Sequence, residues 1–139
     1  MKASEQGLTA EKMAAWYLEQ KGYRILETRF RIRQGEIDII AVPPIAGNLP
    51  FSDPLMENTL LSAQILVFVE VKYRRNLDYG RPSQWVDQKK RNRIIKAAKA
   101  YLVENQLSDQ RMRFDVIEIW QEDGHHKIHH YPNAFGENI

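Results

Sequence analysis

The amino-acid sequence predicts one α/β domain with a mixed central sheet. The chain has 139 residues, which is close to the usual size of a single domain. Helix-type and strand-type apolar patterns follow one another in the order α-β-β-β-α-β-β, which is typical of a sheet flanked by helices. The content of 43% hydrophobic and 27% charged residues is that of an ordinary soluble protein. The absence of cysteine excludes disulfides, thiolate catalysis and cysteine-ligated zinc.

The first third of the chain is expected to form one helix and two strands. Ser4 and Thr9 are both suitable N-caps for the helix, and Gly22 is a suitable stop. Apolar residues recur between them at helical spacing, namely Ala10, Met13, Ala14, Tyr17 and Leu18. A partly alternating strand is predicted over residues 23–32 and a second strand over residues 36–42, separated by a turn.

The middle of the chain contains an insertion followed by the most apolar strand. Residues 43–64 include four prolines and no clear periodicity, which is unusual inside a compact domain. We interpret this segment as a flexible insertion between two strands. Residues 65–73 read Ile-Leu-Val-Phe-Val-Glu-Val-Lys-Tyr and predict a buried third strand. A polar loop then leads to a second helix, expected from about Ser83 to Asn105.

The C-terminal part is expected to add a hairpin to the sheet. Residues 113–120 alternate and predict a strand, Asp123-Gly124 is a strong hairpin signal, and a short last strand is predicted over residues 127–131. The pairs His125-His126 and His129-His130 follow this turn without acidic or cysteine partners at zinc-finger spacing. A solvated hairpin is therefore preferred over a metal site.

The three tryptophans receive different interpretations. Trp16 and Trp120 lie in periodic elements and are expected in the core. Trp85 lies in a basic segment before the second helix, which makes it the best candidate for stacking on a base.

Charged side chains in two apolar strands point most directly to function. Asp38 lies in the second strand, and Glu70 and Lys72 lie in the third. Such charges require partners, because an unpaired buried ion costs several kcal/mol or more. Side chains alternate across a strand, so Glu70 and Lys72 share a face. If the two strands pair, Asp38 lies near both.

Alternation also predicts how the second strand presents its side chains. Glu36, Asp38 and Ile40 are expected to share one face. Ile37 and Ile39 are then expected on the opposite face.

Two carboxylates beside a lysine suit phosphodiester hydrolysis. The carboxylates of Asp38 and Glu70 would bind a hard cation such as Mg²⁺ or Mn²⁺ through oxygen. The metal would lower the pKa of a bound water and offset charge on the phosphate, and Lys72 would position the water or stabilise developing charge. The alternative is a Glu70–Lys72 pair on a solvated face, with Asp38 paired to an arginine.

Basic residues concentrate directly after the charged strand. Residues 72–99 hold ten basic and two acidic side chains, a net charge of +8 in a chain whose total is +2. A localised basic segment fits a polyanionic partner such as nucleic acid, and the alternative is a solvated helix face. The candidate phosphate contacts are Arg31, Arg74, Arg75, Lys90, Arg91 and Arg93.

These motifs resemble those of a known family. Residues 35–41, Gly-Glu-Ile-Asp-Ile-Ile-Ala, and residues 67–74, Val-Phe-Val-Glu-Val-Lys-Tyr-Arg, resemble the YraN-like family of uncharacterised bacterial proteins. Both helices and the strand that begins at Arg113 resemble that family too, so the likeness covers nearly the whole chain in order. The family looks like a branch of the PD-(D/E)xK nuclease superfamily, near archaeal Holliday-junction resolvases.

The resemblance implies a restriction-endonuclease-like αβββαβ core. It also implies roles for individual residues of the active site. It implies Asp38 and Glu70 as metal ligands and Lys72 as the catalytic lysine. It also suggests Glu11, from the first helix, as a further acidic group and metal ligand. From the sequence alone, Glu11 is an acid in a first helical turn, where the helix dipole favours it. The chain departs from the family in having Arg29 where an Asn is usual and in its longer insertion.

The leading functional expectation is a Mg²⁺- or Mn²⁺-dependent endonuclease acting on DNA, with branched or damaged DNA as candidate substrates. One alternative is a nucleic-acid-binding or scaffolding protein that keeps the fold without catalysis, and another is a protein-interaction module. No apolar stretch reaches about 18 residues, so no membrane span is expected. With no recognisable signal peptide, a cytoplasmic protein is expected. A homodimer would suit the cutting of two strands.

Overall fold

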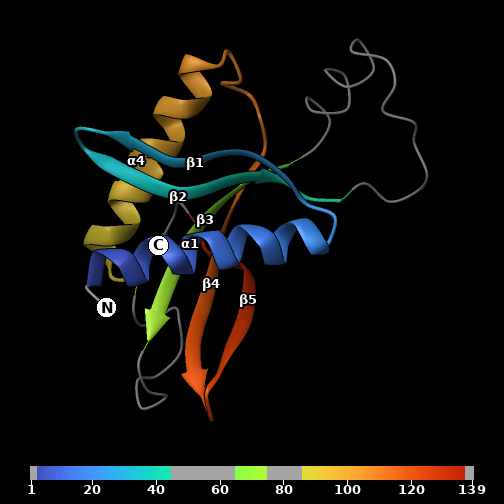
Figure 1. Ribbon diagram of the computed structural model, residues 1–139. Helices are drawn as coiled ribbons and strands as arrows, with labels where there is room; N and C mark the ends of the chain where they lie inside the picture. The colour runs from blue at the N-terminus through green and yellow to red at the C-terminus, as the bar shows by residue number, and fades with distance from the viewer. Residues whose placement is uncertain (1–2, 45–64, 75–85, 137–139) are drawn as a thin grey trace.

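Figure 1 shows the computed structural model, which describes residues 3–44, 65–74 and 86–136. The elements are α1 (Ala3–Gln20), β1 (Arg24–Ile32), β2 (Gly35–Val42), β3 (Leu66–Arg74), α4 (Gln88–Glu104), β4 (Met112–Glu122) and β5 (His125–Phe135). One sheet has the strand order β1-β2-β3-β4-β5, in which β3 and β4 are parallel and the other neighbours antiparallel. This arrangement confirms the predicted single α/β domain and is consistent with a restriction-endonuclease-like core.

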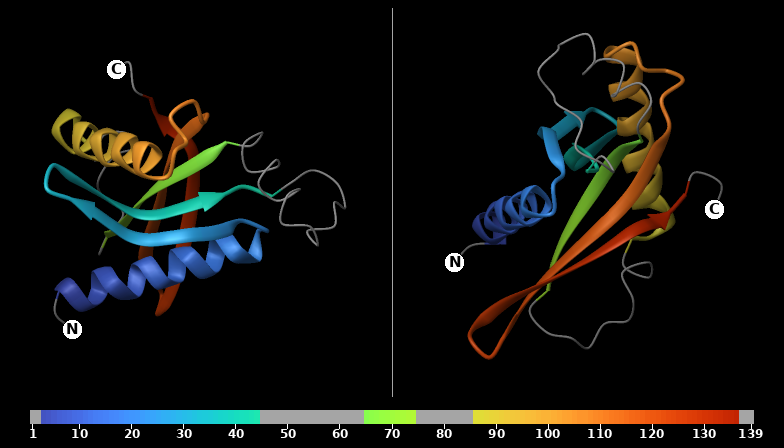
Figure 2. Two further views of the ribbon diagram at one scale, coloured as in Figure 1. Left: turned by 90° about the horizontal axis from the view of Figure 1, so that it is seen from above. Right: turned by 90° about the vertical axis from the view of Figure 1, so that its right-hand side faces the viewer.

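The two helices cover opposite faces of the sheet, as the view from above in Figure 2 shows. Alternation along β3 sends Phe68 toward the α4 side and Val69 toward the α1 side. Phe68 lies edge-on to Tyr101 of α4 and stacks with Phe114 of β4. Each fully buried side chain of this size contributes about 1.5–3 kcal/mol, so the central strands anchor both layers.

The N-terminal helix ends where the sequence predicts, but its tryptophan does not lie in the core. Gly22 has a φ of +90°, the left-handed conformation that stops helices and that glycine adopts without strain. The helix packs Ala14 and Leu18 against the sheet, with both fully buried. Trp16 lies on the other side of the helix and is 60% exposed, so its predicted core position is wrong.

The second helix starts later than predicted. Val86 and Asp87 are not helical, and α4 begins at Gln88. The side chain of Asp87 accepts a hydrogen bond from the backbone N–H of Lys90 at 2.8 Å, which makes Asp87 the N-cap. An Asp at this position satisfies one of the unpaired N–H groups of the first turn.

The C-terminal hairpin is longer than predicted. Asp123 and Gly124 have φ values of +51° and +78°, as the favoured two-residue turn requires, so the predicted turn is confirmed. The last strand extends from His125 to Phe135 rather than over residues 127–131, because a bulge at Asn133, with a φ of +52°, lets it continue past Pro132.

Helix α4 approaches the first residue of β2 very closely. A Cβ atom on Gly35 would lie 1.9 Å from the backbone oxygen of Arg93, so only glycine fits. This contact fixes the N-terminal half of α4 over the start of β2. Of the predicted insertion, residues 45–64 lie outside the described residues, as do Arg75 and Trp85.

Candidate active site

The pairing of β2 with β3 ends at the charged residues. The antiparallel ladder runs from Ala41–Val67 to Ile39–Val69. The next residues along the two strands are Asp38 and Glu70. There the backbone N–H of Val71 donates instead to Oδ2 of Asp38, at 2.7 Å. The two strands thus part at a fork, and both carboxylates lie in it.

The backbone of β2 is irregular at Asp38, so the side chains of this strand do not alternate between the two faces of the sheet as predicted. Across the ladder, Arg29 of β1 takes a φ of +56°. Ile37 packs with Ile40 in the cluster under α4, whereas Ile39 packs in the cluster under α1. The prediction that Ile37 and Ile39 share a face is therefore wrong, because the strand does not alternate regularly through this position.

Glu70 is the most deeply buried group of the fork. It is 8% exposed, and its Oε2 atom is buried without a hydrogen-bond partner. Burial and the negative charge of Asp38 raise the pKa of Glu70 to about 8, although Lys90 and Lys72 act in the opposite direction. A buried carboxylate oxygen without a partner is costly, so this position favours a cation.

Helix α1 brings a third carboxyl group to the same place. The side chains of Glu11 and Asp38 lie within hydrogen-bonding reach, and Oε2 of Glu11 is buried without a hydrogen-bond partner. Burial and Asp38 raise the pKa of Glu11 to about 7, against the effect of Arg29, whose Nε lies 3.7 Å from Glu11 Oε2. The structure thus places Glu11 beside Asp38, on the α1 side of the fork.

A clamp on the α4 side was missed by sequence reasoning. Glu36 accepts hydrogen bonds from Lys90 Nζ and from an Arg93 guanidinium nitrogen, each at 2.8 Å. These two bonds lower the pKa of Glu36 to about 2. Lys90 Nζ also lies 3.7 Å from Glu70 Oε1. The only sequence signal was the position of Glu36 two residues before Asp38.

The fork fits a magnesium-like ion as part of a larger ligand set. No group of three or more His, Cys, Asp or Glu within residues 3–44, 65–74 and 86–136 is arranged to hold a metal ion by itself. Mg²⁺ is commonly held by one or two carboxylates, with waters and substrate phosphates as its remaining ligands. Asp38 and Glu70 supply such a pair, and the unpartnered Oε2 of Glu70 is the donor such an ion requires.

Comparison with known proteins identifies the family. Residues 10–119 match the family model described as "Uncharacterised protein family UPF0102". The chain belongs to the UPF0102 family. This confirms the predicted YraN-like relationship. The matched region includes all three carboxylates of the fork, Lys72 and Lys90.

Individual members of the UPF0102 family align along most of this chain. A UPF0102 protein of Pelobacter propionicus is 43% identical over 130 residues, covering 93% of this chain and 81% of the relative. One of Clostridioides difficile is 39% identical over 135 residues, covering 97% and 100%. One of Carboxydothermus hydrogenoformans is 36% identical over 134 residues, covering 96% and 98%. These relatives carry the family description and no stated activity.

Three of the predicted phosphate contacts lie near the fork in this UPF0102 protein. Lys90 and Arg93 are bound to Glu36, as described above. Arg31 is exposed, lies opposite Glu36 in the β1–β2 register, and lowers the pKa of Glu11 through its charge. These cations thus flank the carboxylates on the α1 and α4 sides.

Arg74 and Arg91, two further candidate phosphate contacts, are bound to other groups than the fork carboxylates. Arg74 forms an ion pair with Glu118, in which the two side chains are 10% and 2% exposed. Arg91 donates to the backbone oxygen of Val86 at 2.7 Å, and its guanidinium lies 5.6 Å from the ring centre of Phe135. Arg75 lies outside the described residues.

A second buried polar cluster was also missed by sequence reasoning. Asp115 of β4 is fully buried and accepts hydrogen bonds from Arg113 on both carboxylate oxygens at 2.8 Å. The backbone N–H of Asn133 donates to it at 2.9 Å, and Nε2 of His130 lies 2.7 Å away. These contacts keep the pKa of Asp115 low despite burial. The cluster ties β5 to β4.

This cluster corrects the expectation of a solvated histidine hairpin in one position. The side chain of His130 is 5% exposed. His130 is opposite Ile117 in the β4–β5 register, and its Nε2 atom lies 2.7 Å from Asp115 Oδ2. His125, His126 and His129 are exposed, as expected.

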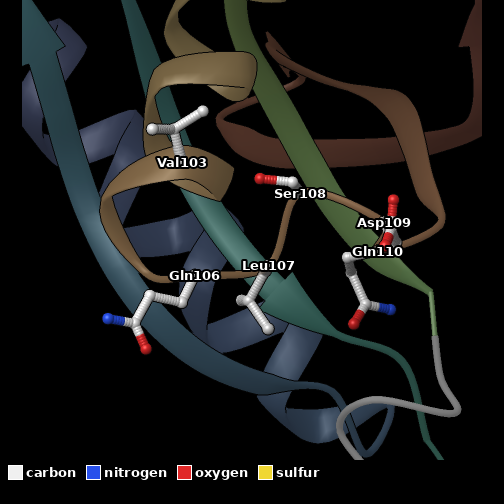
Figure 3. A pocket seen from close by; sticks show the side chains of 6 residues that line it. All are labelled: Val103, Gln106, Leu107, Ser108, Asp109 and Gln110. Carbon is white, nitrogen blue, oxygen red and sulfur yellow. The ribbon is translucent and has the colours of Figure 1, made fainter.

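A shallow pocket lies away from the fork, at the C-terminal end of α4. Figure 3 shows the six side chains that line it: Val103, Gln106, Leu107, Ser108, Asp109 and Gln110. It contains none of the fork carboxylates, so it does not enlarge the site. In the described part of the chain, no helix is both long and apolar enough to span a bilayer.

Proposed function

We propose that this UPF0102 protein is a divalent-metal-dependent DNA endonuclease. The observation that carries the proposal is Glu70: a carboxylate buried at a fork in the sheet, with one unpartnered oxygen and a second carboxylate, Asp38, beside it. A purely structural buried charge is normally fully hydrogen-bonded, as Asp115 is in the same sheet. Glu70 differs from it in the way expected of a metal ligand.

Each residue of the fork has a role in this proposal. Asp38 and Glu70 would hold Mg²⁺ or Mn²⁺, which when bound lowers the pKa of a water and offsets the charge of a phosphate. The ammonium of Lys72, two residues from Glu70 on the same strand, would orient the attacking water or stabilise charge that develops on the phosphate. Glu11, with a pKa of about 7, holds a proton in neutral solution part of the time and can donate a hydrogen bond that fixes the carboxylate of Asp38.

The cations on both sides of the fork support a nucleic-acid substrate. Arg31 on the α1 side and Lys90 and Arg93 on the α4 side lie where a polyanionic backbone crossing the fork would meet them. Contacts of this kind bind without regard to base sequence and weaken with salt. They favour DNA or another polyanion over a neutral substrate.

A cleavage assay with purified protein tests the proposal. Supercoiled plasmid, linear duplex, single-stranded and four-way-junction DNA are incubated with Mg²⁺, Mn²⁺ or EDTA. We expect metal-dependent cutting that falls by about 100-fold or more in Asp38→Ala, Glu70→Ala and Lys72→Ala. The DNA affinity of these variants in EDTA should change little. Comparison of the substrates shows whether branched DNA is preferred.

Matched substitutions on the surface complete the assay. Glu19→Ala and Lys89→Ala each remove an exposed charge of the same sign elsewhere and should cut normally. Cutting that persists in the fork variants would exclude this site as its source. Salt-dependent DNA binding with no cutting in any metal would favour the non-catalytic binding protein instead.

A further inference from the structure

A second lysine, contributed by α4, lies against the metal-binding side of the fork. Lys90 Nζ is 2.8 Å from Glu36 Oε1 and 3.7 Å from Glu70 Oε1. The other oxygen of Glu36 is bound to Arg93 at 2.8 Å, so Glu36 cannot rotate without breaking two charged contacts. The ammonium of Lys90 is therefore held close to the carboxylate that the proposed metal requires.

We propose that the ammonium of Lys90, held by Glu36, occupies the cation position beside Glu70 in the metal-free protein, and that a divalent ion displaces it toward a substrate phosphate. This inference rests on the proposed function. It assigns Lys90 a role different from that of Lys72, since Lys90 is tethered from a helix by an acidic residue outside the metal-ligand pair. Metal and DNA would then bind with positive coupling, with Lys90 as the coupling element.

Electrostatics gives the direction of the effect. While Lys90 stays beside Glu70, a divalent cation entering the fork meets a like charge a few ångströms from its ligand, which weakens metal binding. A phosphodiester offers the ammonium another anion within reach of its flexible side chain. DNA therefore relieves the competition for Glu70, and by linkage the metal strengthens DNA binding by the same factor.

The geometry also explains why Glu36 matters to this exchange. Glu36 accepts a hydrogen bond from Lys90 at 2.8 Å, next to the helix–strand contact at Gly35 that fixes α4 over β2. When the ammonium leaves Glu70, the bond to Glu36 keeps it at the edge of the fork. The displaced charge therefore stays within reach of the scissile region rather than moving into solvent.

Metal binding without DNA is the direct test. The affinity for Mn²⁺ is measured by electron paramagnetic resonance on the wild-type protein, Lys90→Met and Lys89→Met. Lys89 is the adjacent, exposed residue of the same helix, so its variant removes the same charge at a matched position. We expect Lys90→Met to bind Mn²⁺ about tenfold more tightly and Lys89→Met to change the affinity by less than about twofold. Equal affinities for the two variants would overturn the inference.

DNA binding supplies an independent readout. The affinity for a labelled duplex is measured with and without Ca²⁺, and the DNA is checked for integrity on a denaturing gel. We expect Ca²⁺ to strengthen wild-type binding by about tenfold and to strengthen binding by Lys90→Met by no more than about threefold. The same factor in wild type, Lys90→Met and Lys89→Met would contradict the exchange.

Two further variants show whether a negative result refutes the proposed function, refutes only the role of Lys90, or reflects a variant that does not fold. Lys90→Gln keeps a polar group for Glu36 and replaces Lys90→Met if circular dichroism shows that the latter does not fold. Glu70→Ala should lose Mn²⁺ binding. If wild type does not bind Mn²⁺, the proposed function fails and this inference with it. If wild type binds Mn²⁺ through Glu70 but Lys90 variants bind it equally, only the role of Lys90 is refuted.

Discussion

The substitution Glu70→Gln should stabilise the metal-free protein at neutral and alkaline pH. Glu70 has an ordinary pKa of 4.5 in the unfolded chain and a pKa of about 8 in the folded protein. Between these values the folded state binds more protons than the unfolded state, so stability falls as pH rises through this window. Glutamine has nearly the same shape and no charge, so it removes this loss.

The size of the effect follows from the two pKa values. When Glu70 is fully ionised in both the folded and the unfolded state, the difference between its two pKa values corresponds to a loss of about 5 kcal/mol in unfolding free energy, at about 1.4 kcal/mol per pKa unit. The linkage relation gives a difference between variant and wild type of less than about 1 kcal/mol at pH 5 and about 4 kcal/mol at pH 8. Burial of the side chain leaves little solvent screening to reduce these figures.

Urea unfolding from pH 5 to pH 8 in EDTA measures this difference. Glu36 and Asp115 do not contribute to the change in stability over this pH range, because their lowered pKa values affect stability only in acid. Excess Mg²⁺ should restore the stability of wild type at pH 8 and should not affect Glu70→Gln. Parallel stability curves for the two proteins would refute the account of Glu70 as a buried carboxyl group whose burial the neighbouring lysines offset only in part. Glu19→Gln serves as the exposed control.

Two other substitutions test how the site is supported. Gly35→Ala should lower the unfolding free energy by about 2 kcal/mol or more in a urea titration, because the added Cβ meets the backbone of Arg93 and pushes α4 away from β2. Unchanged stability would show that the close contact between α4 and β2 is not rigid. Arg74→Met should lower the unfolding free energy by about 3–5 kcal/mol in the same measurement, because it leaves Glu118 charged and buried. The double variant with Glu118→Leu should recover most of that loss. Failure of the second substitution to restore stability would contradict the pairing.

The sequence predicted the end of the first helix and the last turn well, because these features depend on the conformational preferences of single residues. Gly22 and the pair Asp123-Gly124 adopt positive φ values that few other residues accept, so their positions mark a helix end and a turn. Asp38 and Glu70 were identified because charge in an apolar strand needs a compensating partner. The structure brings both to one fork, as expected.

Features that depend on the docking of helices could not be predicted in the same way. The clamp of Glu36 on Lys90 and Arg93 exists only because α4 lies directly over β2. Trp16 is a different case, because its outward position follows from its place off the apolar stripe of Ala10, Ala14 and Leu18 that α1 buries. The contact of His130 with Asp115 depends on the register in which β5 pairs with β4, which the alternating pattern of a single strand does not reveal.

A crystal soaked with Mn²⁺ tests the central claim most directly. The account predicts one anomalous-scattering peak in the fork, about 2.2 Å from an oxygen of Asp38 and from an oxygen of Glu70, with the ammonium of Lys90 moved away from Glu70. A fork without such a peak, in a crystal that binds Mn²⁺ elsewhere, would contradict it.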